Sequence, residues 1–292
     1  MELTGLRSFH ESDLNPKIVW LASYPKSGNT WFRSFLSVLI SNKDLDINNL
    51  QTNGIFSGKL VFEDALDIDA DYIGPQEAET LRRFSFRYLS EISRKLMYIK
   101  IHDAYTFSEF DSLPLVPTEP TKMAIYLVRN PLDIALSLAN HQDITVDNAI
   151  DNFLINPTST FGKKTNNGSQ QFFQMLGTWS DHVESWLKYP TFPVHFIRYE
   201  DLKAMPFETF KGALNAIGLE VSDTQINQAI ELTRFEKLKE QEQKRGFSEK
   251  MVSANSFFFK GVAGRWKSEL TEKQIKKIKE VNQPMMRHFG YW

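Results

Sequence analysis

Four short runs of mostly apolar residues divide the chain and predict its strands. They cover residues 18–22, 97–101, 123–128 and 194–197. Each run has the length of a strand and ends at polar or charged residues. A continuous apolar run, without alternation, is typical of a parallel strand that is covered on both faces. We therefore predict a parallel sheet in the interior of the molecule.

Helical patterns follow most of these runs. Apolar residues after the first run recur at helical spacing and predict a helix that begins near Thr30, with Trp31, Phe32, Phe35, Leu36, Leu39 and Ile40 on one face. After the third run, Asn130 can cap a helix and Pro131 suits its first position. Capping boxes at 222–225 and 271–274 predict two further helices.

Strand and helix patterns alternate without an internal repeat. This order predicts one α/β domain over residues 1–292, with a central parallel sheet flanked by helices. Segments 51–75 and 156–172 are rich in Gly, Asn, Ser, Thr and Asp, and we predict that both are loops.

Composition narrows the classes of function. Hydrophobic residues make up 41% of the 292 residues, which excludes a disordered chain. The net charge of -2 provides no overall field for nucleic acid or an anionic membrane, so we expect neither as a partner. The absence of cysteine excludes disulfides and zinc–thiolate sites. Without a signal-peptide core or an apolar run of about 20 residues, the chain is expected to be cytoplasmic.

Candidate chemistry gathers where the predicted strands end, which is where parallel α/β sheets bind ligands. The sequence YPKSGNT, residues 24–30, joins the first strand to the first helix. Free backbone N–H groups and the helix dipole favour an anion at such a turn, and Gly28 permits its close approach. Lys26 precedes this glycine, whereas the lysine of the nucleotide-binding P-loop follows its glycine. We favour an anion-binding loop over a plain turn with a solvated lysine.

His102 ends the second strand in IKIH, and Lys100 projects from the same face. An imidazole with an unperturbed pKa of about 6.5 could act as a general base near neutral pH. A structural role is the alternative for a single histidine at a strand end.

Two further cationic segments could hold phosphate. Arg129 ends the third strand and could bind a phosphate through two parallel hydrogen bonds, or form a salt bridge to Asp133. In FFFKGVAGRWK, Lys260 and Gly261 could form a second anion site, or belong to a surface loop anchored by Trp266.

In their order, these motifs resemble those of the cytosolic sulfotransferases that use 3′-phosphoadenosine 5′-phosphosulfate (PAPS). The similarity extends from Tyr24 to about Lys267 and rests on YPKSGNTW, IKIH, YLVRNPLDIALS, GTWSDHVESW, RYEDL, LTRFEKLK and FFFKGVAGRWK. One such motif would be weak support, but the series in family order is specific.

The resemblance implies PAPS as co-substrate, PAP (3′,5′-ADP) as product, and no metal. His102 would be the base, with Lys100 beside it, and Lys26 would stabilise the leaving phosphate. The implied contacts are Lys26, Ser27, Gly28, Asn29, Thr30 and Trp31 to the 5′-phosphosulfate, Arg129, Ser137, Phe259, Lys260 and Gly261 at the 3′-phosphate, and Trp31, Tyr199, Thr233 and Phe235 around adenosine.

The chain departs from the family pattern at several positions. Phe259 stands where the animal enzymes usually have an arginine that contacts the 3′-phosphate, which leaves Lys260 with more of that contact. Asn29 stands where threonine is common and keeps hydrogen bonding. Glu272 and Lys276 occupy two positions of the family's dimer motif, so that mode of dimerisation is not implied and the oligomeric state stays open.

The acceptor is expected between segments 51–75, 103–115, 145–172 and 240–258. Their aromatic residues favour a small apolar or aromatic acceptor that carries a hydroxyl or amine, with a sugar or a lipid-like molecule as alternatives. These aromatic residues, which could equally belong to the core, are Phe56, Phe62, Tyr105, Phe107, Phe161, Phe172, Phe173, Phe247 and Phe257.

Two other functions share the strand–loop–helix pattern. A P-loop kinase or NTPase needs a lysine inside the loop and an aspartate for Mg²⁺, so the position of Lys26 argues against it. A non-catalytic nucleotide-binding module on the same fold is expected to have lost at least one of Lys26, His102, Arg129 and Ser137, and all four are present.

Overall fold

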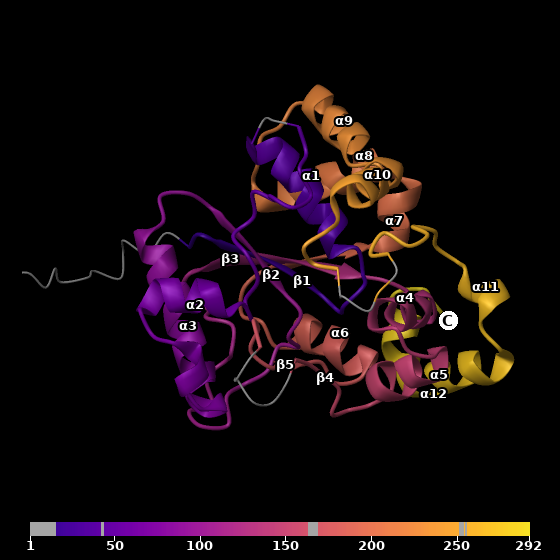
Figure 1. The fold of residues 1–292 in the computed structure, drawn as a ribbon, viewed down its shortest axis with the longest axis horizontal. Coiled ribbons are helices and arrows are strands. Elements are labelled where there is room, and N and C mark those ends of the chain that lie inside the picture. Colours follow the sequence, from indigo (N-terminus) through magenta and orange to yellow (C-terminus); the bar gives the residue numbers. More distant parts are fainter. Residues whose placement is uncertain (1–15, 42–43, 163–168, 251–253, 255) are drawn as a thin grey trace, which may run out of the picture.

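A four-stranded parallel sheet lies at the centre of the molecule (Figure 1). The computed structural model describes residues 16–41, 44–162, 169–250, 254 and 256–292. The strand order is β2-β1-β3-β6, and the strands are β1 (Ile18–Ser23), β2 (Met97–Ile101), β3 (Thr121–Val128) and β6 (Val194–Arg198). Each predicted strand is confirmed to within two residues at either end. The proposed domain boundary at residue 1 lies outside the described residues.

Helices cover both faces of the sheet, because alternate side chains of β1 pack in opposite directions. Trp20 and Ala22 belong to a core with α3 (Pro75–Ile92), α4 (Pro131–Gln142), α6 (Trp179–Lys188) and α12 (Glu272–His288). Val19 and Leu21 belong to a second core with α1 (Asn29–Ser41), α8 (Pro206–Ile217) and α9 (Asp223–Leu232). Figure 1 shows these two groups of helices on opposite sides of the sheet. The predicted α/β architecture is confirmed.

The predicted helix starts are also confirmed. The side chain of Asn130 accepts a hydrogen bond from the backbone N–H of Leu132 and caps α4. Ser222 and Thr271 form the expected capping boxes of α9 and α12. The remaining elements are α2 (Lys59–Leu66), η2 (Ala70–Tyr72), α5 (Val146–Ala149), η3 (Ile150–Leu154), β4 (Thr160–Phe161), β5 (Gln174–Met175), α7 (Tyr199–Ala204), α10 (Phe235–Arg245) and α11 (Trp266–Glu269). Over the described ranges, every helix is too short or too polar to cross a membrane.

The prediction of a loop over 51–75 is wrong, because the segment contains α2 and η2. Gly58 and Asp67, which suggest a loop, instead mark the two ends of α2, and Asp67 ends it in the left-handed conformation with φ 55°. Phe62 anchors the helix, with its ring centroid 5.1 Å from that of Phe172. In the second predicted loop, 156–172, residues 163–168 lie outside the described part of the chain.

A buried ion pair connects α3 to the residue after His102. Arg82 Nη2 lies 3.2 Å from Asp103 Oδ1, and the two side chains are 3% and 1% exposed. The guanidinium also covers the ring of Phe56 at 4.1 Å. Because Asp103 adjoins His102, this pair holds the end of β2 in place.

Arg82→Met should lower the free energy of unfolding by about 3–5 kcal/mol, because it leaves the Asp103 carboxylate buried without its partner. Arg87 lies on the same helix, but its side chain is 48% exposed and pairs with Glu91 at the surface. Arg87→Met should therefore cost less than about 1 kcal/mol. Urea denaturation measures both variants, and equal losses would contradict the assignment.

Candidate active site

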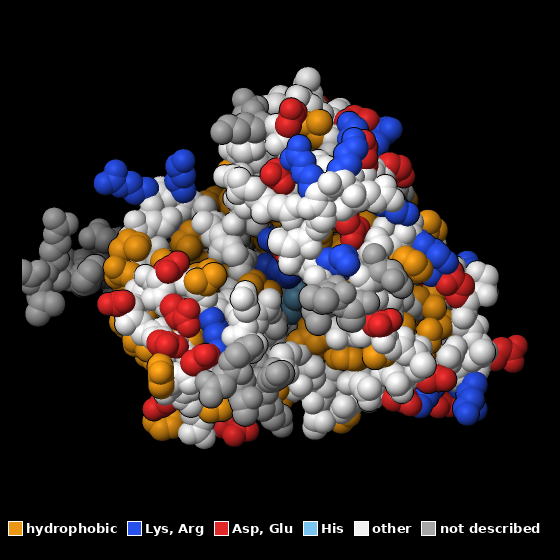
Figure 2. All heavy atoms as spheres, viewed as in Figure 1, with side chains coloured by type: hydrophobic (Ala, Val, Ile, Leu, Met, Phe, Trp, Pro, Cys, Tyr) orange, Lys and Arg blue, Asp and Glu red, His pale blue; other side chains and the backbone are white. Residues whose placement is uncertain are grey.

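One pocket of about 620 Å³ opens at the carboxyl edge of the sheet. Its walls come from the β1–α1 turn, the end of β2, the inner face of α4, the start of α7 and the chain that follows α10. Figure 2 shows the hollow near the middle of this face, with Lys or Arg side chains and a histidine inside it. A pocket of this size suits a nucleotide-sized ligand together with a small second one.

The turn from β1 into α1 aims backbone N–H groups at this pocket. Gly28 has φ 97°, and a Cβ placed there would lie 2.7 Å from the ring of Tyr199, so this position requires glycine. The Asn29 amide donates to the carbonyl of Leu21 at 2.8 Å and pins the turn to β1. The first amides of α1 have no partner within the helix, so they can hold an anion.

His102 presents a free lone pair to the pocket. Its Nδ1 lies 2.8 Å from the backbone oxygen of Ser23, and because a carbonyl only accepts, Nδ1 carries the proton. Nε2 is then the unprotonated nitrogen. Burial, together with the charge of Lys100, holds the pKa of His102 well below its usual value. At neutral pH the imidazole is therefore neutral and can accept a proton.

Two lysines bring positive charge into the same space. Lys26 Nζ lies 3.9 Å from the ring centroid of Phe257. Burial first, then Lys100 and Arg129, lowers the pKa of Lys26 to about 7. Burial also lowers the pKa of Lys100, against the opposing effect of Glu249. Burial and neighbouring positive charges disfavour the charged form of both lysines, and an anion between them would stabilise it.

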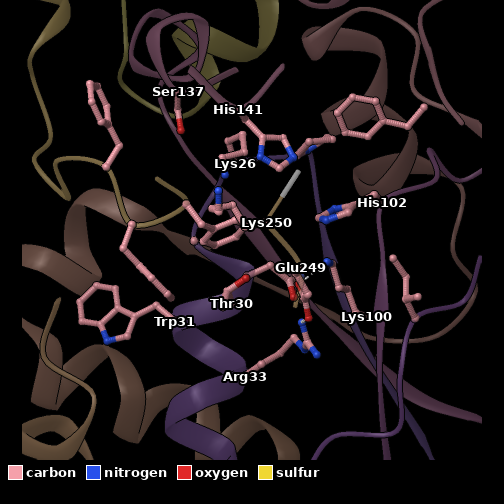
Figure 3. Close-up of a pocket in the computed structure, with 18 of the residues that line it drawn as sticks. Lys26, Thr30, Trp31, Arg33, Lys100, His102, Ser137, His141, Glu249 and Lys250 are labelled. Carbon is pink, nitrogen blue, oxygen red and sulfur yellow. Dashed lines mark hydrogen bonds and ion pairs between the residues drawn. The ribbon is translucent and has the colours of Figure 1, made fainter. Parts of the chain in front are cut away.

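Glu249 supplies part of that negative charge, and the sequence did not indicate it. Its carboxylate lies 2.6 Å from Arg33 Nη1 and 2.9 Å from Lys100 Nζ, and Figure 3 shows it between these two residues. Burial alone would raise the pKa of Glu249, but Lys100 and Arg33 outweigh burial and lower it. The ionised Glu249 therefore fastens the chain after α10 over the pocket.

Arg129 lies at the opposite side of the turn from His102. Its Nη1 donates to the carbonyl of Lys26 at 3.0 Å, and its guanidinium covers the Tyr199 ring at 4.4 Å. Arg129 Nε is buried without a hydrogen-bond partner among the described residues. The alternative salt bridge to Asp133 is not formed in this part of the chain. Asp133 instead accepts from the backbone N–H of Gly264 at 2.6 Å and so holds the C-terminal glycine motif.

The C-terminal glycine motif adds Lys260 and Arg265 to the cationic end of the pocket. Gly261 has φ 64°, and a Cβ would lie 2.4 Å from the Phe235 ring, so the ring can pack against this position only when it is glycine. Phe259 lies between two cations, with its ring centroid 5.3 Å from Lys260 and 5.2 Å from Arg265. Arg265 lines the pocket and was not predicted. Ser137 reaches the same space from α4 (Figure 3).

Two predicted contacts lie elsewhere. Ser27 is fully buried and does not line the pocket, and its hydroxyl has no partner among the described residues. Thr233 is also fully buried, and its hydroxyl donates to the carbonyl of Ala229 at the end of α9. The other predicted cofactor and catalytic residues line the pocket, namely Lys26, Gly28, Asn29, Thr30, Trp31, Lys100, His102, Arg129, Ser137, Tyr199, Phe235, Phe259, Lys260 and Gly261.

Of the nine aromatic residues predicted around an acceptor, Phe161 and Phe257 line the pocket. Four others fill the core, namely Phe56, Phe62, Tyr105 and Phe172. Phe107 is 49% exposed, Phe247 packs behind Phe257, and Phe173 does not line the pocket.

The pocket wall contains polar groups that the sequence did not single out. His141 lies one helical turn after Ser137 on α4, so the spacing of the two residues could have indicated it. The carboxamides of Gln142, Gln170, Gln171 and Gln174 also line the wall. The last three residues reach the pocket because the segment around β5 folds back toward it, and no local sequence pattern predicts this path of the chain.

Comparison with known proteins bears on this arrangement. A family model described as the sulfotransferase domain matches residues 16–290. Flavonol 3-sulfotransferase of Flaveria bidentis is 24% identical over 286 residues, which cover 91% of this chain and 81% of the relative. Human sulfotransferase 1C2 is 22% identical over 281 residues, which cover 92% of this chain and 83% of the relative.

The fold has solved counterparts as well. The crystal structure of mouse sulfotransferase SULT7A1 complexed with PAP aligns with a TM-score of 0.58 at 22% identity, over 93% of this chain and 85% of that one. This likeness concerns the fold. The family model covers nearly all of the chain, and the resemblance seen in the motifs is confirmed. The chain belongs to the sulfotransferase family of enzymes.

Proposed function

We propose that the protein transfers the sulfuryl group of PAPS to a hydroxyl or amine of a small acceptor. The observation that carries the proposal is the neutral His102, whose free Nε2 lines the same pocket as the desolvated Lys26 and Lys100. A base for the acceptor and a cation for the leaving group thus lie together. A cytoplasmic location, and no role for nucleic acid or a membrane, belong to the same proposal.

The residues present fit PAPS. Arg129 Nε is buried without a partner among the described residues, and an anionic ligand would supply one. Gly28 lets the Tyr199 ring pack directly against the turn, and Gly261 does the same for the Phe235 ring. The 5′-phosphosulfate would be held by Lys26, Asn29, Thr30, Trp31 and the first amides of α1. Ser27 would contribute through its backbone rather than its buried hydroxyl.

The 3′-phosphate would be held at the opposite side of the turn. Arg129, Ser137 and Lys260 lie there, and Arg265 adds a guanidinium beside Phe259, at the place where the family's usual arginine is missing. The rings of Trp31, Tyr199 and Phe235 would enclose the adenine, while Thr233 supports this wall from within.

The mechanism assigns one role to each residue. PAPS supplies the sulfuryl group and PAP as the leaving group. His102 Nε2 takes the acceptor proton as the acceptor O–S bond forms and the S–O bond to the 5′-phosphate breaks, a contribution of about 10²–10⁴-fold. Lys26 and the α1 amides stabilise the charge that develops on the phosphate. Lys100 orients the transferred group, and no step is assigned to a metal.

PAP should raise the melting temperature of the protein far more than Mg–ATP does. A P-loop kinase or NTPase would respond in the opposite way, because its lysine and aspartate bind a triphosphate with Mg²⁺. Differential scanning fluorimetry with each nucleotide at equal concentration distinguishes the two. A larger shift with Mg–ATP would refute the proposal.

His102→Ala should abolish transfer from labelled PAPS while the Kd for PAP stays within about twofold, because His102 acts on the acceptor. Arg129→Ala is the converse variant, and PAP binding should weaken by about 2–5 kcal/mol. Isothermal calorimetry and a transfer assay measure both. A non-catalytic nucleotide-binding module would bind PAP equally well in wild type and His102→Ala and transfer sulfuryl in neither.

PAP binding should take up protons through Lys26. The pKa of Lys26 is about 7 in the free protein, and a bound anion raises it. Between the two values the complex holds more protons than its components, so the affinity should fall as pH rises above about 7. Calorimetry near pH 8 in buffers of different ionisation enthalpy counts the protons. The uptake should vanish in Lys26→Met, and an unchanged count in this variant would contradict the assignment.

A further inference from the structure

The wall of the pocket next to His102 is rich in carboxamides. It carries Gln170, Gln171 and Gln174 around β5. This wall lies on the β2 side of the site, because the backbone N–H of Ala104 donates to the carbonyl of Met175 at 2.8 Å. The phosphate-binding cations lie on the β3 side. The carboxamides therefore face the acceptor that His102 would deprotonate.

Gln174 on this wall and His141 on the facing wall each have a buried atom without a hydrogen-bond partner in the described part of the chain. Gln174 is 2% exposed, and its Nε2 donates to Gln171 Oε1 at 3.1 Å, which also accepts from Ser57. These bonds fix the orientation of Gln174, yet its Oε1 is buried and unpaired. Leaving a buried acceptor unsatisfied costs about 1–3 kcal/mol, so the atom points to a ligand that donates to it.

His141 repeats the pattern on the facing wall. Its ring lies at 5.8 Å from that of Phe257, and its Nδ1 is buried without a partner among the described residues. Burial, with the charges of Lys26 and Lys100, lowers the pKa of His141 to about 3. The neutral imidazole can hydrogen-bond a hydroxyl, and Figure 3 shows it on the pocket side of α4.

An acceptor with a single hydroxyl would leave both atoms unpaired. Its one hydroxyl is used at His102, and its apolar remainder offers no donor to Gln174 Oε1 and no partner to His141 Nδ1, so both buried atoms stay unsatisfied. A molecule with several hydroxyls satisfies all three positions, while Phe161 and Phe257 can cover its C–H faces.

We propose that the acceptor is a carbohydrate or cyclic polyol, with one hydroxyl at His102 Nε2, a second donating to Gln174 Oε1 and a third bonded to His141 Nδ1. This inference rests on the proposed sulfuryl transfer. It develops the sugar that the sequence left as an alternative to an apolar or aromatic acceptor, and seven of the nine aromatic residues expected around the acceptor do not line the pocket.

A transfer assay with labelled PAPS tests the inference with matched acceptors. Cyclohexanol and myo-inositol share a six-membered ring and differ in the number of hydroxyls, and methyl glucopyranoside, cellobiose and para-nitrophenol extend the comparison. The polyhydroxylated probes should exceed cyclohexanol in kcat/KM by about 100-fold or more. A preference for cyclohexanol or para-nitrophenol, or PAP binding without transfer to any polyhydroxylated probe, would overturn it.

Gln174→Met preserves side-chain length and removes the amide. It should reduce the ratio of kcat/KM between myo-inositol, or the best glycoside, and cyclohexanol by about tenfold or more. Gln228→Met on the exposed surface of α9 is the matched control and should leave the ratio unchanged. His141→Phe provides the same readout if Gln174→Met does not fold. An equal effect on all acceptors would refute the role of Gln174.

The two proposals fail in different ways. If PAP does not bind and no acceptor receives sulfuryl, the sulfotransferase function itself fails. If PAP binds and only monohydroxylated acceptors are sulfated, the proposed function stands and the polyol inference fails.

Discussion

The parallel strands β2, β1 and β3 end at the same edge of the sheet, and the arrangement of the site depends on this shared edge. β1 lies between the other two, so the turn that leaves it has the end of β2 on one side and the end of β3 on the other. The carbonyl of Ser23 orients His102, and the carbonyl of Lys26 holds Arg129. One short backbone segment thus positions the proposed base and the proposed phosphate ligand. A shift in strand register would displace both.

The same edge concentrates positive charge where little water remains. Lys26, Lys100, Arg33 and Arg129 all line the pocket, and burial and mutual repulsion together lower the pKa of Lys26 to about 7. Glu249 offsets two of these cations in the free protein. One carboxylate against two cations leaves the β2 side with an excess of positive charge, and Lys26 and Arg129 form no ion pair among the described residues. This excess of positive charge favours an anion such as the proposed phosphosulfate.

Local patterns predicted the strands, the helix caps and the residues at strand ends, because each depends on neighbours within a few positions. They failed where packing joins distant segments. Glu249 meets Lys100 across 149 positions, and Gln174 reaches the pocket only through the pairing of β4 and β5. Phenylalanine content could not separate core from pocket, since Phe56 and Phe257 are equally apolar and only the fold decides which one faces the ligand. Thr233 belongs to a motif that the resemblance places beside the adenosine, but its hydroxyl donates to the carbonyl of Ala229 in α9, the helix that ends just before it.

The chain after α10 links the two halves of the pocket. Phe257 covers Lys26 and contacts His141, so one ring keeps water from both the phosphosulfate side and the acceptor side. Two carboxylates hold this chain differently. Glu242 accepts from the backbone N–H groups of Phe257 and Phe258 at 2.6 and 2.9 Å, bonds that no ligand in the pocket would contest. Glu249 accepts a hydrogen bond from Lys100, and Lys100 is also the residue proposed to orient the sulfuryl group. Binding of the proposed phosphosulfate would therefore compete with the bond between Glu249 and Lys100, while Glu242 would still hold Phe257 over Lys26.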